Sequence, residues 1–290
     1  MDILDFVKTH IPKRYADSNK GSYGKCLMIC GSDRYPGAPI LACAGAVRSG
    51  AGLVELYSTE KVVCAALPVY PDIIYHTIND ISSGDDNESI AGQSGTADCI
   101  LIGCGCGVSE NLYRLTSEIA NTEGGPTVID ADALNSISVF DRNLEIFASA
   151  KRHIVITPHP LEFSRLCGLT VAEISDNRVG CATAFATLHN VYVLLKGNGT
   201  VSASPDGKYT VNTTGSSALA KAGSGDVLAG VITSFIAQGC TPYDAAVISA
   251  YLHGAAGDTL ARRLSEYGVA ASDLPVAIAE EIRRLFPACG

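Results

Sequence analysis

Short apolar runs alternate with longer segments of small and polar residues along most of this chain. This alternation predicts a parallel sheet that is covered by helices on both faces. The runs that we expect to form strands are Lys25–Cys30, Leu53–Tyr57, Asp98–Gly103, Thr127–Asp130, His153–Thr157 and Val191–Lys196. An antiparallel hairpin is expected after them, because Pro205-Asp206-Gly207-Lys208 is a turn sequence between Val201–Ser204 and Tyr209–Asn212.

The segments between the strands predict helices. We expect helices over Pro39–Ser49, Glu110–Ala120 and Val171–Leu188, and an almost wholly helical stretch from Gly225 to Leu285. The polar run Asn79–Thr96 predicts an exposed loop. With no internal repeat, the pattern favours one α/β domain over residues 21–290, preceded by an N-terminal extension over residues 1–20.

Composition narrows the class of protein. The 290 residues are 47% hydrophobic and 18% charged, which excludes a disordered chain. The net charge of −9 argues against a nucleic-acid partner, since a basic face is what such a partner needs. The start of the chain has no signal-peptide pattern and no apolar run is long enough for a membrane span, so we expect no membrane association.

Eleven cysteines are scattered along the chain without a CxxC pair. Cys26 and Cys30 alternate with apolar residues of a predicted buried strand, where a thiol behaves as a small apolar group. Cys104 and Cys106 lack a neighbouring histidine or further cysteine at metal-ligand spacing. We therefore expect reduced thiols in the cytoplasm and no cysteine metal site.

The strongest chemical signal is the turn Gly223-Ser224-Gly225-Asp226 ahead of a predicted helix. Free amides and the helix dipole at such a start form an anion site. Two roles are open for Asp226 at this point: a helix cap, or a general base beside a bound phosphate.

Two further segments follow predicted strands. Lys196 is followed by Gly197-Asn198-Gly199-Thr200, where the lysine could face phosphate or sugar, or could be a solvated residue of an ordinary turn. His159 stands between two prolines at the carboxyl end of a strand, the edge where ligands bind in open α/β sheets, or is a surface loop residue.

Three other segments bear on the ligand. Asp130 and Asp132 could hold Mg²⁺ through water or cap a helix. Small residues around Gly31 and Gly37-Ala38 would let a flat ligand approach, or simply serve packing. Neither GxxxxGK[ST] nor GxGxxG is present, so a Walker-type NTPase and a standard Rossmann site are not supported.

Taken together, these segments resemble a known family. The motifs KGSYGK, CGSDRYPGA, RSGAGLVEL, IGCGCG, VIDADALN, ITPHPLEF, LLKGNGT, NTTGSSALAKAGSGDVLAG and Ala250-Tyr251-Leu252-His253-Gly254 occur in that order between Lys20 and Ala261. They are similar to those of the ADP/ATP-dependent NAD(P)H-hydrate dehydratases of the ribokinase-like superfamily. The resemblance implies a ribokinase-like three-layer α/β/α sandwich with a mostly parallel central sheet.

The resemblance also implies an activity. The substrate would be the 6S hydrate of NADH or NADPH, which carries water across the C5=C6 bond of the nicotinamide ring. ADP or ATP with Mg²⁺ would phosphorylate the hydroxyl, and loss of phosphate would restore the reduced cofactor. A homo-oligomer, specifically a tetramer, would be expected.

Site residues follow from the same resemblance. Asp226 would be the catalytic acidic residue, in agreement with the general base inferred from the turn. The residues that would contact the hydrate are Ala38, Gly105, His159 and Asp226. Those that would contact the adenine nucleotide are Lys196, Gly197, Asn198, Gly199, Thr200 and Gly225. No residue is assigned as the ligand of a resident metal ion.

The chain departs from the family pattern at two places, Cys104 in place of a proline and Ala222 in place of a glycine. Neither removes a proposed chemical group. No epimerase domain precedes the motifs, so a separate NAD(P)H-hydrate epimerase or an excised domain is expected. Two alternatives stay open: a hydroxymethyl kinase of the same fold, and a silent nucleotide-binding module.

Overall fold

A nine-stranded sheet forms the centre of the protein, and its strand order is β3-β2-β1-β4-β5-β6-β7-β8-β9. The computed structural model describes residues 2–286. The strands are β1 Lys25–Ile29, β2 Leu53–Ser58, β3 Ile74–Thr77, β4 Cys99–Ile102, β5 Thr127–Ile129, β6 Ile154–Ile156, β7 Tyr192–Leu195, β8 Val201–Ala203 and β9 Tyr209–Val211. Neighbouring strands from β3 to β7 pair in parallel, and β8 and β9 are antiparallel. All strands predicted from the sequence are therefore confirmed, together with the hairpin.

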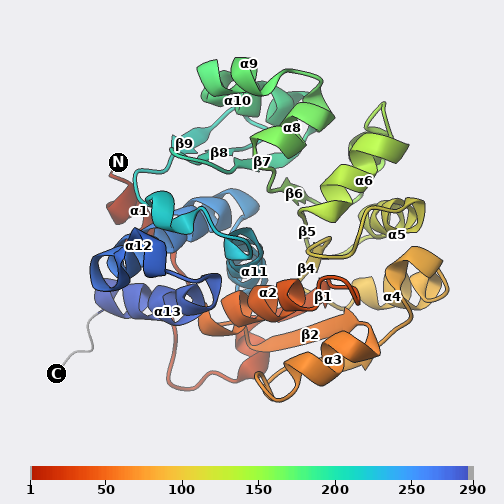
Figure 1. The fold of residues 1–290 in the computed structure, drawn as a ribbon, viewed down its shortest axis with the longest axis horizontal. Helices are drawn as coiled ribbons and strands as arrows, with labels where there is room; N and C mark the ends of the chain where they lie inside the picture. The colour runs from red at the N-terminus through yellow and green to blue at the C-terminus, as the bar shows by residue number, and fades with distance from the viewer. Residues whose placement is uncertain (1, 287–290) are drawn as a thin grey trace.

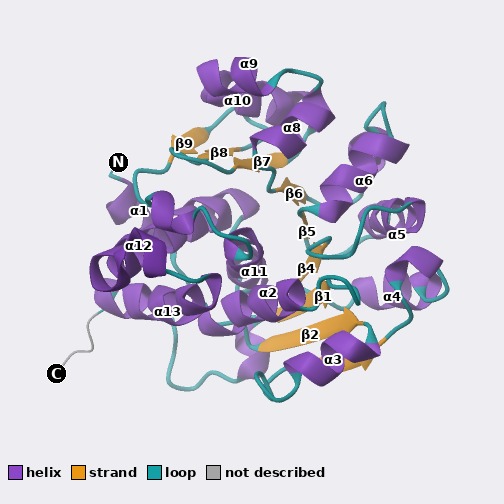
Figure 2. Ribbon diagram, viewed as in Figure 1, coloured by secondary structure: helices purple, strands orange, loops and turns teal. Residues whose placement is uncertain are grey.

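Helices cover both faces of this sheet (Figures 1 and 2). One layer contains α1 Ile3–His10, α2 Gly37–Arg48, α3 Glu60–Ala66, α11 Ser224–Ala237, α12 Pro242–Gly268 and α13 Leu274–Leu285. The other contains α4 Asn87–Ser94, α5 Glu110–Ala120, α6 Asp132–Phe140, α7 Glu145–Ser149, α8 Pro160–Cys167, α9 Val171–Asp176 and α10 Arg178–His189. Short 3₁₀ turns lie at η1 Lys20–Tyr23, η2 Ile81–Ser83, η3 Ser217–Leu219 and η4 Ala271–Asp273. The three-layer α/β/α architecture with a mostly parallel sheet is confirmed.

Successive side chains of each central strand enter opposite cores. In β1, Cys26 and Met28 pack against the layer of α2 and α11, whereas Leu27 and Ile29 pack against the layer of α5 and α6. All four are fully buried. Both faces must therefore be apolar, and this is why the strands appear in the sequence as continuous apolar runs.

The helices α2 and α11 touch backbone to backbone. A Cβ at Gly230 would lie 1.9 Å from the carbonyl oxygen of Ala42, and one at Gly45 would lie 2.4 Å from that of Val227. Any side chain at either glycine would push the helices apart. Both helices begin at the same edge of the sheet, so this contact fixes how their first turns lie relative to each other.

Three features differ from the sequence predictions. The run Asn79–Thr96 is not an exposed loop, because it contains η2 and α4, and Ile90 and Ser94 on α4 are buried. Its few apolar residues are enough to anchor one short helix. The predicted helix Val171–Leu188 is divided at Asn177, whose side chain accepts a hydrogen bond from the amide of Gly180 and begins α10. Strand β3 was not predicted, since this edge strand has no buried residue.

The N-terminal segment is in contact with the domain. Val7 of α1 is fully buried and belongs to the same core as α12. Within residues 2–286, no helix has both the length and the apolar character needed to cross a membrane.

Candidate active site

The chemically distinctive segments meet at the carboxyl ends of the parallel strands. The glycine-rich turn of Gly103 follows β4, Asp130 follows β5, His159 follows β6 and Lys196 follows β7. The first turn of α11, with Asp226, reaches the same edge, as shown by its contact with Cys104 and Asp130. The topology thus assembles residues that are more than 100 positions apart in the chain.

Asp226 stands in the first turn of α11, after the N-cap residue Gly223, which has a φ of 90°. Among residues 2–286, no backbone amide donates a hydrogen bond to its carboxylate, so its side chain does not cap the helix. Burial raises the pKa of Asp226 to about 7, and the neighbouring Asp130 adds to this. A carboxylate that gains and loses a proton near neutral pH is suited to general acid–base chemistry.

Lys196 forms a buried ion pair and is not a solvated turn residue. Its Nζ lies 2.8 Å from Oδ1 of Asp130, whose side chain is 2% exposed. Burial acts to lower the pKa of Lys196, but the charges of Asp130 and Glu162 outweigh it and the net shift is upward. The lysine is therefore charged at neutral pH, and Asp130 supplies the counter-charge. The side chain of Asp130 is thus engaged by Lys196 and does not cap α6, whose N-cap residue is Ala131.

His159 caps α8 with its imidazole. Its Nδ1 accepts hydrogen bonds from the amides of Leu161 and Glu162, both at 3.2 Å. Its Nε2 lies 3.3 Å from Oε1 of Glu162, and burial lowers the pKa of the ring. Because Nδ1 accepts, the neutral ring carries its proton on Nε2. Burial raises the pKa of Glu162 to about 7.

A cavity of about 890 Å³ opens beside these groups. This volume lies within the range of cofactor sites. Five of the six residues expected to contact a nucleotide line it, together with His159; the five are Lys196, Gly197, Asn198, Thr200 and Gly225. The sixth, Gly199, belongs to the same turn but is not part of the wall. The rest of the wall comes largely from residues 212–221 and the start of α11.

Ala38, Gly105 and Asp226 lie outside the wall of that cavity and form a second group beside it. A Cβ at Gly105, whose φ is +69°, would lie 2.8 Å from Cβ of Ala38. The thiol of Cys104, next to Gly105, donates to Oδ2 of Asp130 at 3.7 Å and lies within 4.8 Å of a carboxylate oxygen of Asp226. On the other side, Nζ of Lys196 lies 3.4 Å from the position of a Cβ at Gly225. Asp226 and Lys196 therefore stand where the two groups meet.

Two further groups complete this region. Asp132 accepts a hydrogen bond from the amide of Gly107 at 2.8 Å and so fixes the turn after β4. His253 lines the cavity, and its Nε2 lies 3.0 Å from the carbonyl oxygen of Ser224. Burial lowers the pKa of His253 to about 4, so the ring is neutral. No role could be assigned to His253 from the sequence, because its partner Ser224 is 29 residues away.

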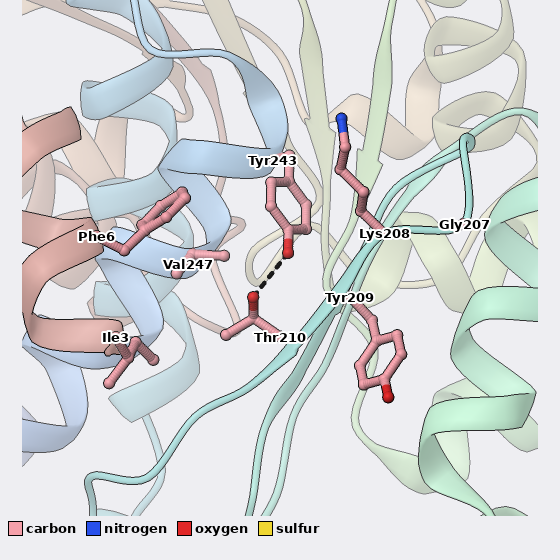
Figure 3. A pocket seen from close by; sticks show the side chains of 8 residues that line it. All are labelled: Ile3, Phe6, Gly207, Lys208, Tyr209, Thr210, Tyr243 and Val247. Carbon is pink, nitrogen blue, oxygen red and sulfur yellow. Dashed lines mark hydrogen bonds between the residues drawn. The ribbon is translucent and has the colours of Figure 1, made fainter. Parts of the chain in front are cut away.

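A smaller cavity of about 420 Å³ lies elsewhere, between α1, the β8–β9 turn and α12 (Figure 3). Its wall includes Phe6, Tyr243 and Thr210, and the last two share a hydrogen bond of 2.7 Å. Lys208 at its rim is paired with Asp206 at 2.7 Å. None of the site residues predicted from the sequence borders this cavity.

Comparison with known proteins gives a consistent result. Residues 26–282 match the family model of NAD(P)H-hydrate dehydratase. The chain is 34% identical to the ADP-dependent (S)-NAD(P)H-hydrate dehydratase of Neisseria meningitidis, over 94% of this chain and 88% of that one. It is 33% identical to the bifunctional NAD(P)H-hydrate repair enzyme of Thermofilum pendens, over 95% of this chain but 53% of that one. The chain thus spans about half the length of the bifunctional relatives it matches.

A solved structure agrees with these sequence matches. The ADP/ATP-dependent NAD(P)H-hydrate dehydratase of Bacillus subtilis, co-crystallised with ATP and Mg²⁺, superposes with a TM-score of 0.87. It is 32% identical, and the match covers 97% of both chains. The ribokinase-like fold expected from the sequence motifs is confirmed.

Proposed function

Because this chain belongs to the NAD(P)H-hydrate dehydratase family, we propose that it restores NADH or NADPH from the 6S hydrate with ADP or ATP as phosphoryl donor. The observation that carries the proposal is the position of Asp226. This carboxyl group, with a pKa of about 7, stands between the nucleotide-sized cavity and the group of Ala38 and Gly105. A phosphoryl transfer between two substrates needs a base at such a junction.

The reaction has two steps. The Asp226 carboxylate takes the proton of the hydrate hydroxyl, and the hydroxyl oxygen attacks the terminal phosphorus of the nucleotide, whose bond to the bridging oxygen breaks. In the second step the C6–O bond of the ester breaks and phosphate leaves, as the lone pair of the ring nitrogen forms a C=N bond to C6. Water then takes the proton at C5, the C5–H electron pair forms the C5=C6 bond, and the C=N pair returns to nitrogen. Phosphorylation helps because phosphate is a far better leaving group than hydroxide.

The chain's own groups suit this sequence. The amide of Gly225 in the first turn of α11 has no hydrogen-bond acceptor among residues 2–286, so it can donate to a phosphoryl oxygen where the helix dipole favours negative charge. Lys196 reaches the same place from β7. We expect Asp226 to hold the hydroxyl proton and Lys196 to contact the nucleotide phosphates.

Mg²⁺ would accompany the nucleotide and offset the charge of its phosphates. Ligand atoms of Cys104, Asp130 and Asp226 lie within 4.8 Å of one another. The two carboxylates are donors of the type that Mg²⁺ prefers. The thiol does not fit, because a hydrogen bond with Cys30 and burial raise the pKa of Cys104 well above its usual range. Asp130 is already neutralised by Lys196, and Asp226 has to accept the hydroxyl proton, so the phosphates of the nucleotide would hold the ion.

One assay tests the activity. The protein is supplied with prepared NADH hydrate, Mg²⁺ and either ADP or ATP, and the reduced-nicotinamide absorbance and released phosphate are followed together. We expect both to rise in equal amounts, faster with ADP. A stable phosphomonoester without recovery of absorbance would instead indicate a hydroxymethyl kinase, and nucleotide binding without turnover would indicate a silent module.

Two aspects of the proposal concern partners. A separate NAD(P)H-hydrate epimerase would convert the R hydrate into the 6S form that this chain consumes, a role consistent with the bifunctional relatives. The protein would act as a homotetramer, and light scattering of the purified protein measures this directly.

A further inference from the structure

Arg178, the first residue of α10, lies directly behind the turn over residues 197–200, where we expect the nucleotide to bind. Its Nη2 donates hydrogen bonds to the carbonyl oxygens of Leu195 at 2.9 Å and Lys196 at 3.1 Å. Both guanidinium Nη atoms would lie 3.1 Å from a Cβ at Gly197. The guanidinium therefore holds the end of β7 and covers the glycine at which the turn begins.

The charge of Arg178 has no counter-ion among residues 2–286. Its hydrogen-bond partners are two neutral carbonyl groups, and its Nε is buried without a partner. Lys196, in contrast, is neutralised by Asp130 at 2.8 Å. Burial lowers the pKa of Arg178, which shows that the charged form is costly in this place. A nearby anion would offset this cost, since Coulomb interactions are strong where water is excluded.

We propose that Arg178 is a positioning residue of the nucleotide site, which fixes the turn over residues 197–200 through two carbonyl groups and supplies the unpaired positive charge that favours a polyphosphate. The proposal rests on the nucleotide cavity assigned above. It separates two contributions: the hydrogen bonds position the turn for any adenosine compound, and the charge acts only on ligands that carry phosphates.

The chain offers a matched control in Arg152. This buried arginine also donates to backbone carbonyl groups, those of Thr122 at 2.6 Å and Gly125 at 3.2 Å. Burial lowers the pKa of this guanidinium too. Its partners precede β5, so it lies at the opposite edge of the sheet from the cavity. Arg152→Gln therefore removes a comparable structural arginine far from the nucleotide.

The test is calorimetric binding of ADP and adenosine to the wild type, Arg178→Gln, Arg178→Lys and Arg152→Gln. We expect Arg178→Gln to weaken ADP binding about tenfold, which corresponds to about 1.4 kcal/mol, and adenosine binding about threefold. Arg178→Lys should recover the part that depends on charge, because lysine keeps the charge but not the planar fork. Arg152→Gln should lower the unfolding temperature and leave the Kd for ADP unchanged.

Turnover gives an independent readout. In Arg178→Gln the KM for ADP should rise while kcat stays within about twofold of the wild type, as expected when ground-state binding alone is lost. The proposal is overturned if Arg178→Gln binds ADP as the wild type does, or if Arg152→Gln weakens ADP equally. Because calorimetry needs no hydrate, a wild type that binds ADP but does not restore NADH would contradict the proposed function alone.

Discussion

Lys196 and Asp130 form an ion pair of 2.8 Å that joins the ends of β7 and β5 across the end of β6. The aspartate side chain is almost fully buried and the lysine side chain is 18% exposed. The pair therefore has two roles: it holds three strand ends together, and it presents one ammonium group to the proposed nucleotide cavity.

Removal of one partner should separate these roles. Asp130→Asn leaves the lysine charge unpaired, and we expect a loss of about 3 kcal/mol in the free energy of unfolding. Lys196→Ala leaves the more deeply buried Asp130 unpaired, so it should lower the free energy of unfolding as well and should also weaken nucleotide affinity. An unchanged Kd for ADP would remove Lys196 from the site. Urea unfolding and ADP titration measure the two effects. The double variant Asp130→Asn/Lys196→Met should regain stability relative to Asp130→Asn, because no buried charge is then left alone.

Asp226→Asn should keep nucleotide binding and lose most dehydration activity. The amide preserves the shape of the first turn of α11 but cannot accept the hydroxyl proton, so we expect a loss of about 10²- to 10⁴-fold in kcat. Absorbance recovery from NADH hydrate measures the rate, and calorimetry with ADP serves as the control. Near-normal turnover by this variant would rule out Asp226 as the base.

The raised pKa of Asp226 predicts opposite effects of pH on rate and stability. The base must be ionised, so kcat/KM should rise with pH through about 7. In the folded protein the group keeps its proton at pH values where the unfolded chain has lost it. Its contribution to stability is therefore present at low pH and is lost as the pH rises to about 7.

Asp226→Asn should remove this dependence. The variant should unfold at a higher temperature than the wild type at pH 8, and the difference should shrink towards pH 4. Calorimetric scans over this range provide the measurement. A difference that grows on acidification would contradict a raised pKa for Asp226 in the folded state.

Two glycines of the turn after β4 allow a matched steric test. Gly105 and Gly107 have φ angles of +69° and +79°, so alanine is strained at both and should cost about 1 kcal/mol or more of stability. At Gly105 the methyl group would also meet Ala38, whereas at Gly107 nothing lies within 4 Å. We expect Gly105→Ala to raise the KM for the hydrate and Gly107→Ala to leave it near the wild-type value. Equal KM values for the hydrate in the two variants would show that Gly105 does not contact the hydrate.

Substitution of His159 can distinguish capping from substrate contact. His159→Ala removes the acceptor for two amides and should cost about 1 kcal/mol of stability. His159→Asn keeps a capping oxygen and should restore stability. If the imidazole contacts the hydrate, both variants should have a raised KM for the hydrate. A wild-type KM in His159→Asn would show that His159 serves only as a helix cap.

The fold could be predicted from the sequence more fully than the contacts between the site residues. Buried strands can be predicted because both of their faces are apolar. Strand β3 has polar and exposed positions, so it lacks this pattern and was not predicted. Asn177 shows how one side chain can divide a segment whose periodicity predicts a single helix. Asp226 and Lys196 were identifiable because each stands beside a glycine turn. The Lys196–Asp130 pair was not, since 66 residues separate its members and only the strand order brings them together.

The backbone contact between α2 and α11 makes the candidate active site sensitive to substitutions at that contact. Ala38 is in the first turn of α2 and Asp226 is in the first turn of α11, so one interhelical spacing sets the gap between them. Gly45 and Gly230 determine that spacing from positions that lie a turn or two away from either group. Random mutagenesis should therefore find inactive, folded variants at these two glycines, far more often than in the surface loops that surround the substrates.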